Sequence, residues 1–246
     1  MIGRIPLRIR RGPNRGLRWS LASSGRGAVA GDFEERRVTA FLRLLRPGDV
    51  VWDIGAHKGY LTLAASGAVG ARGHVYAIEP ARENLVYLRR HVAWNGRDNI
   101  NVVPVAMSDR DESARFGGSG SSTTFRLGQG DTVVDVRTLS TLIRTGLASP
   151  HAVKIDVEGS EAAVLRGAAD TLLDDMVLLI AIHSRTQYEE CRAQLEQRGF
   201  RVYRSGAMIQ MMERLPAGWS PDPDLLAVGP GRELSPDAIA YFTAVP

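Results

Sequence analysis

Short apolar runs alternate along most of the chain with longer segments in which apolar residues recur at helical spacing. The apolar runs predict strands at 50–52, 75–78, 102–107, 133–136, 152–157, 176–182, 200–203 and 225–228. The helical spacing predicts helices at 35–45, 60–68, 81–94, 139–143, 161–173 and 188–198. Repeated strand–helix–strand units with nearly continuous apolar strands are typical of a parallel sheet that helices cover on both faces. We therefore expect one doubly wound α/β domain over residues 32–246.

The first 31 residues follow a different pattern, in which apolar and polar residues alternate with a period of two. Ile5, Leu7 and Ile9 occupy alternate positions, which predicts a half-buried strand. A turn at 12–14 and a second strand at 17–22 would complete a β-arm that packs on the domain. The same segment carries six arginines, namely Arg4, Arg8, Arg10, Arg11, Arg15 and Arg18. Arginines suit an anionic partner such as nucleic acid or a phosphorylated substrate, but the alternation favours the packed arm.

Composition narrows the class of protein. With 44% hydrophobic and 24% charged residues over 246 positions, and a net charge of +4, the chain has the composition of a globular protein. Its longest apolar run, 176–182, is far shorter than the roughly 18 residues that cross a bilayer. A single cysteine, Cys191, excludes a disulfide within the chain and a cysteine-based zinc cluster. No apolar segment follows Arg10 and Arg11 as a secretion signal requires, so we expect a cytoplasmic protein with no membrane partner.

The segment 50–60, VVWDIGAHKGY, contains a glycine-rich turn between a predicted strand and a predicted helix. In doubly wound sheets, ligands bind at the carboxyl ends of the strands, near the first such turn. Asp53, Gly55 and Gly59 follow the spacing D-x-G-x-x-x-G, which differs from the G-x-G-x-x-G of dinucleotide-binding proteins. A carboxylate at the strand end suits a ligand that carries an ammonium group and no phosphate. S-adenosylmethionine is such a ligand.

A second acidic residue, Glu79, ends the next predicted strand, 20 residues after Gly59. An acidic residue in this position accepts hydrogen bonds from the two hydroxyls of a ribose. The simpler alternative is that Asp53 and Glu79 only cap the helices that follow them. The turn and the two carboxylates together favour cofactor binding. The absence of the G-x-G-x-x-G spacing disfavours a nicotinamide-dependent oxidoreductase on the same architecture.

On these residues the chain resembles the FkbM-type S-adenosylmethionine-dependent methyltransferases. The resemblance extends from Asp32 to Tyr203 and rests on the runs DFEE, RPGDVVWDIGAHKGYLTLAA, VYAIEPARENLVYLRRHVAWNG, VPVAMSD and VKIDVEGSEAAVLRGA. It implies the Rossmann-like class I methyltransferase fold, with a mostly parallel sheet and an antiparallel C-terminal strand. The β-arm predicted from the alternation in residues 1–31 precedes this domain. The resemblance further implies methylation of a hydroxyl group on a sugar, a polyketide or another small natural product.

The resemblance also implies roles for particular residues. At the methionine end of the cofactor it places Asp53, Gly55, His57 and Gly59. At the ribose it places Glu79, and beside the adenine it places Met107 and Ser108. Two positions depart from the family pattern. His57 stands where asparagine is more usual, and Ala181 stands where glutamate often occurs.

Three further residues are candidates for catalysis. Side chains alternate along a strand, so Asp156 and Glu158 share a face at the carboxyl end of the strand predicted at 152–157. His183 ends the neighbouring strand, and an imidazole with the ordinary pKa of about 6.5 accepts a proton at neutral pH. We expect His183 to be the base that deprotonates the acceptor hydroxyl, with Asp156 or Glu158 orienting either His183 or the acceptor. A divalent metal on the same three groups is the alternative, but Ala181 removes one potential ligand, so no metal is expected.

The same sequence bears on two other functions. A nucleic-acid methyltransferase acting on amino groups commonly has an Asn/Asp-Pro-Pro-aromatic run after the fourth strand, where this chain has DVEG at 156–159. A binding module without catalysis is disfavoured by the presence of both Asp53 and Glu79. The glycine- and serine-rich segment 117–130 is predicted to be either a mobile loop over the substrate side of the sheet or a plain surface hairpin.

Overall fold

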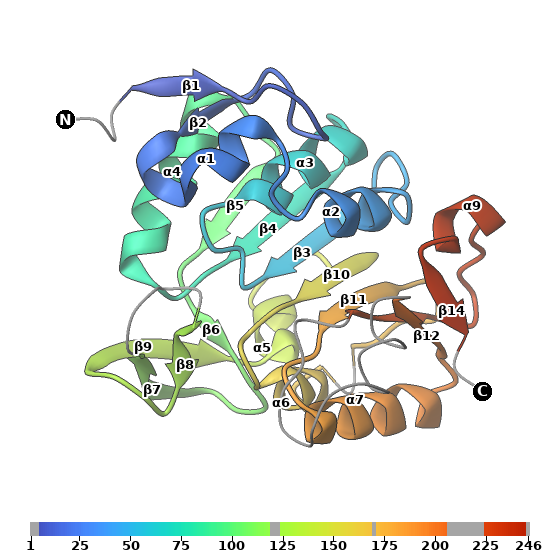
Figure 1. The fold of residues 1–246 in the computed structure, drawn as a ribbon. Coiled ribbons are helices and arrows are strands. Elements are labelled where there is room, and N and C mark those ends of the chain that lie inside the picture. The colour runs from blue at the N-terminus through green and yellow to red at the C-terminus, as the bar shows by residue number, and fades with distance from the viewer. Residues whose placement is uncertain (1–4, 119–123, 169–170, 206–223, 245–246) are drawn as a thin grey trace.

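A central sheet of eight strands organises the computed structural model, which describes residues 5–118, 124–168, 171–205 and 224–244 (Figure 1). Its strands are β3 (Val50–Ile54), β4 (His74–Ile78), β5 (Ile100–Val103), β10 (Ala152–Ile155), β11 (Val177–Ala181), β12 (Arg201–Ser205), β13 (Asp224–Val228) and β14 (Phe242–Ala244). They follow the order β14-β12-β13-β11-β10-β3-β4-β5. From β11 to β5 neighbouring strands pair in parallel, whereas β13 and β14 each run antiparallel to their neighbours. The expected doubly wound, mostly parallel sheet with an antiparallel C-terminal strand is confirmed.

Helices cover both faces of this sheet because successive strand residues point to opposite sides. Val51 belongs to the apolar core on one face and Trp52 to the core on the other. The first core includes residues of α1 (Leu21–Ala30), α2 (Glu35–Leu42), α3 (Tyr60–Val69), α4 (Arg82–Trp94) and α9 (Pro236–Ile239). The second includes residues of α5 (Leu139–Arg144), α6 (Glu161–Arg166) and α7 (Arg185–Gln197). None of the helices in the described ranges is long and apolar enough to span a membrane.

Chain order reverses at β3, whose neighbours β4 and β10 lead to opposite halves of the sheet. In open α/β sheets such a reversal leaves a crevice at the carboxyl ends of the two central strands. Here that crevice lies after Ile54 of β3 and Ile155 of β10, which are paired in register. The fold therefore positions the predicted glycine-rich turn and the predicted catalytic segment side by side.

A second, four-stranded sheet was not predicted. It consists of β6 (Ala106–Met107), β7 (Glu112–Gly117), β8 (Arg126–Leu127) and β9 (Thr132–Arg137), in the order β6-β9-β7-β8. The single strand expected at 102–107 is divided between the two sheets at Pro104, which has no N–H to donate to a ladder. The small sheet lies toward the end of the central sheet to which β3 and β4 point (Figure 1).

Several element ends also differ from expectation. The strand predicted at 152–157 ends at Ile155, so Asp156 and Glu158 belong to the loop that follows it. The helix predicted at 161–173 is shorter, since α6 ends at Arg166 before Gly167. Most of the connection between the strands predicted at 200–203 and 225–228, including Met208, Met211 and Met212, lies outside the described residues.

The N-terminal segment forms a hairpin followed by a helix. Strands β1 (Pro6–Arg8) and β2 (Arg18–Ser20) pair antiparallel, but the strand predicted at 17–22 gives way to α1 at Leu21. Of the alternating apolar residues only Ile9 is buried, whereas Leu7 is 39% and Ile5 64% exposed. The exposed fraction of these side chains thus increases toward the start of β1, the outer strand. The arm packs on the domain through β2, whose Trp19 side chain is fully buried. The division at residue 31 into an arm and a domain stays a prediction.

Candidate active site

The turn between β3 and α3 needs glycine at its first position. Gly55 has a φ of 77°, and a Cβ built on it would lie 1.8 Å from the carbonyl oxygen of Asp156. The amides of Gly55 and Ala56 both donate to the carbonyl of Ile78, at 2.9 and 3.0 Å. Glycine thus allows the backbone after β3 to approach the backbone after β10 more closely than any side chain permits.

Glu79 organises the same turn from the end of β4. Its carboxylate accepts hydrogen bonds from the amide of His57 at 2.7 Å, the amide of Ala81 at 2.8 Å and the side chain of Asn84 at 3.2 Å. The residue is only 4% exposed, and this burial raises the pKa of its carboxyl despite the opposing hydrogen bonds. Each carboxylate oxygen has more than one acceptor position, so the group retains capacity for a ligand hydroxyl.

A cavity of about 700 Å³ opens at this end of the sheet, within the range of 300 to 1,000 Å³ that is usual for small-molecule sites. It brings together eight of the ten predicted site residues: Asp53, Gly55, His57, Glu79, Met107, Asp156, Glu158 and His183. Gly59 does not line it, because it caps α3 and packs against Leu88. Ser108 does not line it either, and its amide donates to the carbonyl of Arg137.

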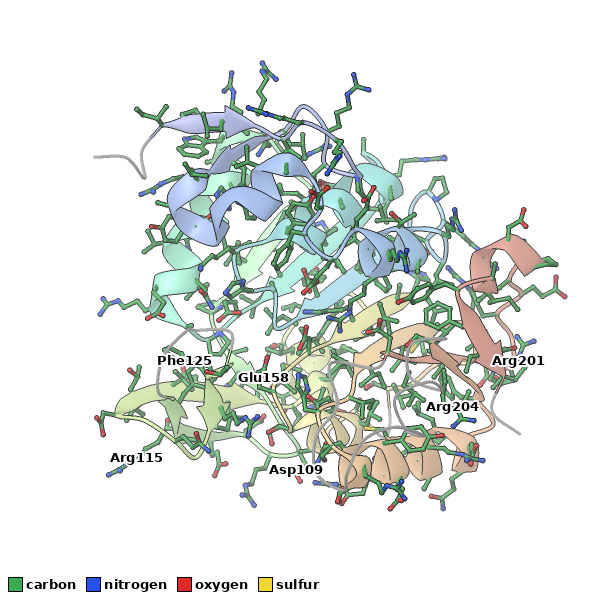
Figure 2. All side chains as sticks on the ribbon, viewed as in Figure 1. Asp109, Arg115, Phe125, Glu158, Arg201 and Arg204 are labelled. Atoms are coloured by element: carbon green, nitrogen blue, oxygen red, sulfur yellow. The ribbon has the colours of Figure 1, made fainter. Side chains whose placement is uncertain are left out.

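The cavity also has walls that the sequence did not predict. Trp19 and Phe33 line it from the N-terminal segment, and Phe116 and Phe125 line it from the small sheet. In Figure 2, Phe125 lies on the small-sheet side and Glu158 on the side of the central sheet. Thr124 to Leu127, which belong to the predicted 117–130 loop, border the cavity. Residues 119–123 of that loop lie outside the described chain. The role of this loop as a lid stays a prediction.

Backbone strain is concentrated around the cavity. Among the described residues, three that are not glycine have positive φ: Glu34 at 48°, His57 at 51° and Glu158 at 58°. All three line the cavity. A left-handed conformation is uncommon for residues with a Cβ and clusters at functional sites. The strained backbone positions thus lie around the same cavity as the predicted site residues.

A buried lysine joins the two halves of the site. Lys154 of β10 is 5% exposed, and its ammonium donates to the carbonyl of Gly55 at 2.7 Å. The ammonium also lies 3.5 Å from Oδ1 of Asp53 and 3.4 Å from Oδ2 of Asp156. Burial opposes its charge, but the carboxylates of Asp156 and Asp53 outweigh burial and raise the pKa of Lys154. The other oxygen of Asp53 accepts a hydrogen bond from Thr62 at 2.6 Å.

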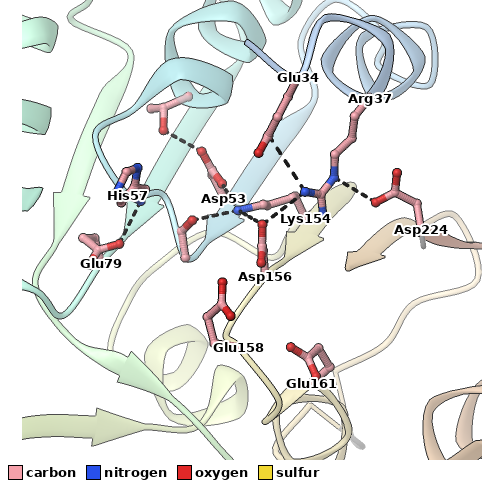
Figure 3. Close-up of polar contacts among 12 residues, drawn as sticks. Glu34, Arg37, Asp53, His57, Glu79, Lys154, Asp156, Glu158, Glu161 and Asp224 are labelled. Carbon is pink, nitrogen blue, oxygen red and sulfur yellow. Dashed lines mark hydrogen bonds and ion pairs between the residues drawn. The ribbon is translucent and has the colours of Figure 1, made fainter. Parts of the chain in front are cut away.

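Arg37 of α2 completes this network, a position that no pattern in the sequence predicts (Figure 3). Its Nη1 lies 3.3 Å from Oδ2 of Asp156 and 3.9 Å from Glu34, and its Nε lies 2.8 Å from Oδ1 of Asp224. Burial disfavours the charged form of Asp156, but Lys154, Arg37 and His183 outweigh it and hold the pKa of this carboxyl well below its usual range. Asp156 is therefore a fixed negative charge at neutral pH.

His183 has a different protonation state from the one expected. Its Nδ1 lies 2.8 Å from Oε1 of the buried Glu161, and its Nε2 lies 3.6 Å from Asp156 and 3.5 Å from Glu158. Burial alone would lower the pKa of this imidazole. The hydrogen bond to Glu161 and the three negative charges outweigh burial and raise the pKa to about 9. His183 is thus protonated at neutral pH in this environment, and the ordinary value of about 6.5 does not apply. It must lose that proton before it can act as a base.

The same three side chains could hold a metal ion. One ligand atom from each of Asp156, Glu158 and His183 lies within 4.8 Å of the other two. Carboxylate oxygens and an imidazole nitrogen are suitable ligands for Mn²⁺, and the carboxylates also suit Mg²⁺. A bound cation would replace the proton that His183 carries.

Comparisons with known proteins agree with this geometry. A family model described as the methyltransferase FkbM domain matches residues 53–202, and a search of curated proteins returned no significant match. Among solved structures, an FkbM methyltransferase from Methylobacillus flagellatus KT shares 23% identity over 75% of this chain, with a TM-score of 0.52. This chain spans only 45% of the length of that protein.

Two other solved structures share the fold at lower identity. A putative rRNA-methylase from Clostridium thermocellum is 11% identical over 80% of this chain and 96% of its own, with a TM-score of 0.54. A SAM-dependent O-methyltransferase from Thermotoga maritima is 15% identical over 82% of this chain and 67% of its own, with a TM-score of 0.51. At these identities the likeness concerns the fold alone.

Proposed function

The chain belongs to the FkbM methyltransferase family, whose members use S-adenosylmethionine, and from this membership we propose that it methylates a hydroxyl group of a small molecule. The observation that supports the proposal is a single cavity lined both by the glycine-rich turn and by the Asp156, Glu158 and His183 cluster. Family membership excludes the nicotinamide-dependent oxidoreductase considered from the sequence. When bound, the cofactor supplies a methyl group on a positively charged sulfur.

The residues around the turn fit this cofactor. Asp53 is fully buried, and its Oδ1 has no hydrogen-bond donor within the described chain, only the Lys154 ammonium at 3.5 Å. We assign the methionine end of the cofactor to Asp53, Gly55 and His57, and the ribose to Glu79. Met107 borders the space left for the adenine.

The hydroxyl acceptor would then lie between the turn and the three catalytic candidates. Its proton must leave as the new bond between oxygen and the methyl carbon forms. Asp156 is a weak base because its pKa is depressed, so its role is to attract and orient His183. His183 takes the acceptor proton once its own proton has left. A divalent cation on Asp156, Glu158 and His183 is the second candidate mechanism, and the raised pKa of His183 favours it, because it shows that the cluster attracts positive charge.

Ribose recognition is tested by replacing Glu79 with glutamine. Glutamine has one carbonyl oxygen where glutamate has two, so it cannot serve both the turn amides and a ribose. We expect S-adenosylhomocysteine to bind about 1 to 3 kcal/mol more weakly in isothermal titration calorimetry. Glu83→Gln is the control, because Glu83 is an exposed acidic residue in the first turn of α4 and does not line the cavity. Unchanged affinity in Glu79→Gln would remove ribose recognition from the proposal.

Single-turnover methyl transfer to a hydroxyl compound identified by screening distinguishes the two mechanisms. With saturating cofactor, His183→Ala is expected to lose about a hundredfold or more in rate, as removal of a general base does. Asp156→Asn is also expected to lower the rate, because it removes the charge that orients His183. His74→Ala is the control, because His74 starts β4 at the opposite end of the sheet from the cavity. A chelator should leave the wild-type rate unchanged if His183 acts alone, whereas loss of activity on chelation assigns the cluster to a metal. Wild-type rates in both variants would contradict either mechanism.

A further inference from the structure

A histidine outside the cavity holds the strained part of the glycine-rich turn. His57 has a φ of 51°, and its amide is fixed by Glu79 at 2.7 Å. The next carbonyl, that of Lys58, lies 2.8 Å from Nδ1 of His91, which is fully buried on α4. His91 does not line the cavity. The turn is thus bonded from two sides, by a residue that faces the ligand space and by one behind it.

The surroundings of His91 determine which of its nitrogens donates. Its Nε2 accepts a hydrogen bond from the amide of Ser20 at 3.1 Å, so Nδ1 carries the proton and donates to the carbonyl of Lys58. Burial lowers the pKa of His91 to about 4, which keeps the ring neutral at pH 7 and able to make both bonds. The ring also stacks on Trp19, with centroids 3.7 Å apart. One side chain therefore joins α4, the N-terminal arm and the turn.

We propose that His91 is a positioning residue for the methionine end of the cofactor. Its Nδ1–H holds the carbonyl of Lys58, and this contact keeps His57 in the left-handed conformation that shapes the floor of the cavity. The bond from Ser20 to Nε2 serves the arm and fixes the tautomer. This inference rests on the proposed placement of the cofactor at Asp53, Gly55 and His57.

Two conservative variants separate the two hydrogen bonds of His91. The side-chain amide of asparagine in His91→Asn occupies the place of Nδ1 and can still donate to Lys58. In His91→Gln the longer side chain places its oxygen near Nε2, so it can accept from Ser20 but loses the donor at Nδ1. Both variants remove the stacking on Trp19, so both are expected to lower the melting temperature by similar amounts.

Affinities for two ligands, measured by calorimetry at pH 7, test the proposal. S-adenosylhomocysteine contains the amino-acid part of the cofactor, whereas 5′-methylthioadenosine lacks it. We expect His91→Gln to bind S-adenosylhomocysteine about tenfold more weakly, the effect of one lost hydrogen bond, and to bind 5′-methylthioadenosine within about threefold of the wild type. His91→Asn should stay close to the wild type for both. Equal losses in the two variants, or equal losses for the two ligands, would overturn the proposal.

Asp53→Asn, measured in parallel, shows whether the underlying cofactor placement is correct. Selective loss of S-adenosylhomocysteine in Asp53→Asn but not in His91→Gln would reject the positioning role alone, and loss in neither variant would reject the placement as well. If the His91 variants do not fold, nitrogen-15 NMR of the wild-type imidazoles provides the second measurement. It should show His91 protonated at Nδ1, and this resonance should shift with S-adenosylhomocysteine and not with 5′-methylthioadenosine. A proton on Nε2, or equal shifts with both ligands, would contradict the proposal.

Discussion

Replacing Lys154 with methionine is expected to destabilise the protein by about 3 to 5 kcal/mol at pH 7, the usual effect of removing one partner from a buried ion pair. Methionine retains most of the volume of the stem but leaves Asp53 and Asp156 without the ammonium that lies between them. The carbonyl of Gly55 also loses its donor. Urea denaturation monitored by circular dichroism measures the change in the free energy of unfolding.

The pH dependence of this loss identifies its cause. In the wild type, the lowered pKa of Asp156 means that its ion pairs stabilise the fold above the ordinary carboxyl value of 3.8 and lose this effect only below it. In Lys154→Met, a buried carboxylate that has lost the ammonium can take up a proton at a higher pH than in the wild type. The difference in the free energy of unfolding between the variant and the wild type should therefore become smaller as the pH falls from 7 to 5. Lys58→Met is the matched control, because the ammonium of Lys58 is less buried and donates to the carbonyl of Ser23. Equal destabilisation by the two lysine variants would contradict the ion-pair explanation.

Gly55→Ala is expected to cost about 2 to 4 kcal/mol of stability and to abolish measurable cofactor binding. The new methyl group would sit at a φ of 77° and 1.8 Å from the carbonyl oxygen of Asp156. Relief of this overlap requires the turn after β3 to move away from the loop after β10. Such a movement separates the two walls of the cavity.

Gly199→Ala separates the conformational cost from the overlap. Gly199 follows α7 with a φ of 78°, almost the same as that of Gly55, but a Cβ there meets nothing within 4 Å. Its alanine variant should therefore lose only the cost of the left-handed conformation, about 1 to 2 kcal/mol, and should bind S-adenosylhomocysteine normally. Calorimetry and urea denaturation on both variants provide the comparison. Normal cofactor affinity in Gly55→Ala would show that the close approach to Asp156 is dispensable.

The predictable part of this protein lies where local pattern and structure agree. The apolar runs that became β3, β4, β10 and β11 are buried on both faces, so the signal for a parallel sheet was strong. The turn motif was recognisable because the positive φ at Gly55 is a local requirement that favours glycine. Asp156 and His183 were predicted as site residues because both lie at the carboxyl end of a central strand. The strand predicted at 152–157 was too long, since Asp156 lies just beyond the end of β10.

What the sequence did not predict depends on contacts between distant residues. Arg37 and Asp224 are 187 positions apart, and nothing local to either one indicates that they pair or that Arg37 also reaches Asp156. The pKa of His183 follows from Glu161, a buried carboxylate whose place behind the imidazole becomes visible only in three dimensions. The arm was misread at Ile5 and Leu7 for a related reason, since alternation indicates which side a residue faces but not how far the body of the protein extends beneath it.

The position of β13 limits which strands can join the sheet while the chain is still being translated. This strand is made late, yet it lies between β11 and β12, and Asp224 at its start pairs with Arg37. β12 therefore cannot join the sheet until the ribosome has translated beyond residue 228. Although domains generally begin to fold from their N-terminal parts as they emerge, a chain that stops before β13 lacks Asp224, one of the carboxylates that pair with Arg37. Premature termination before β13 therefore leaves Arg37 without its ion pair to Asp224 and leaves the sheet without the strand that joins β11 to β12.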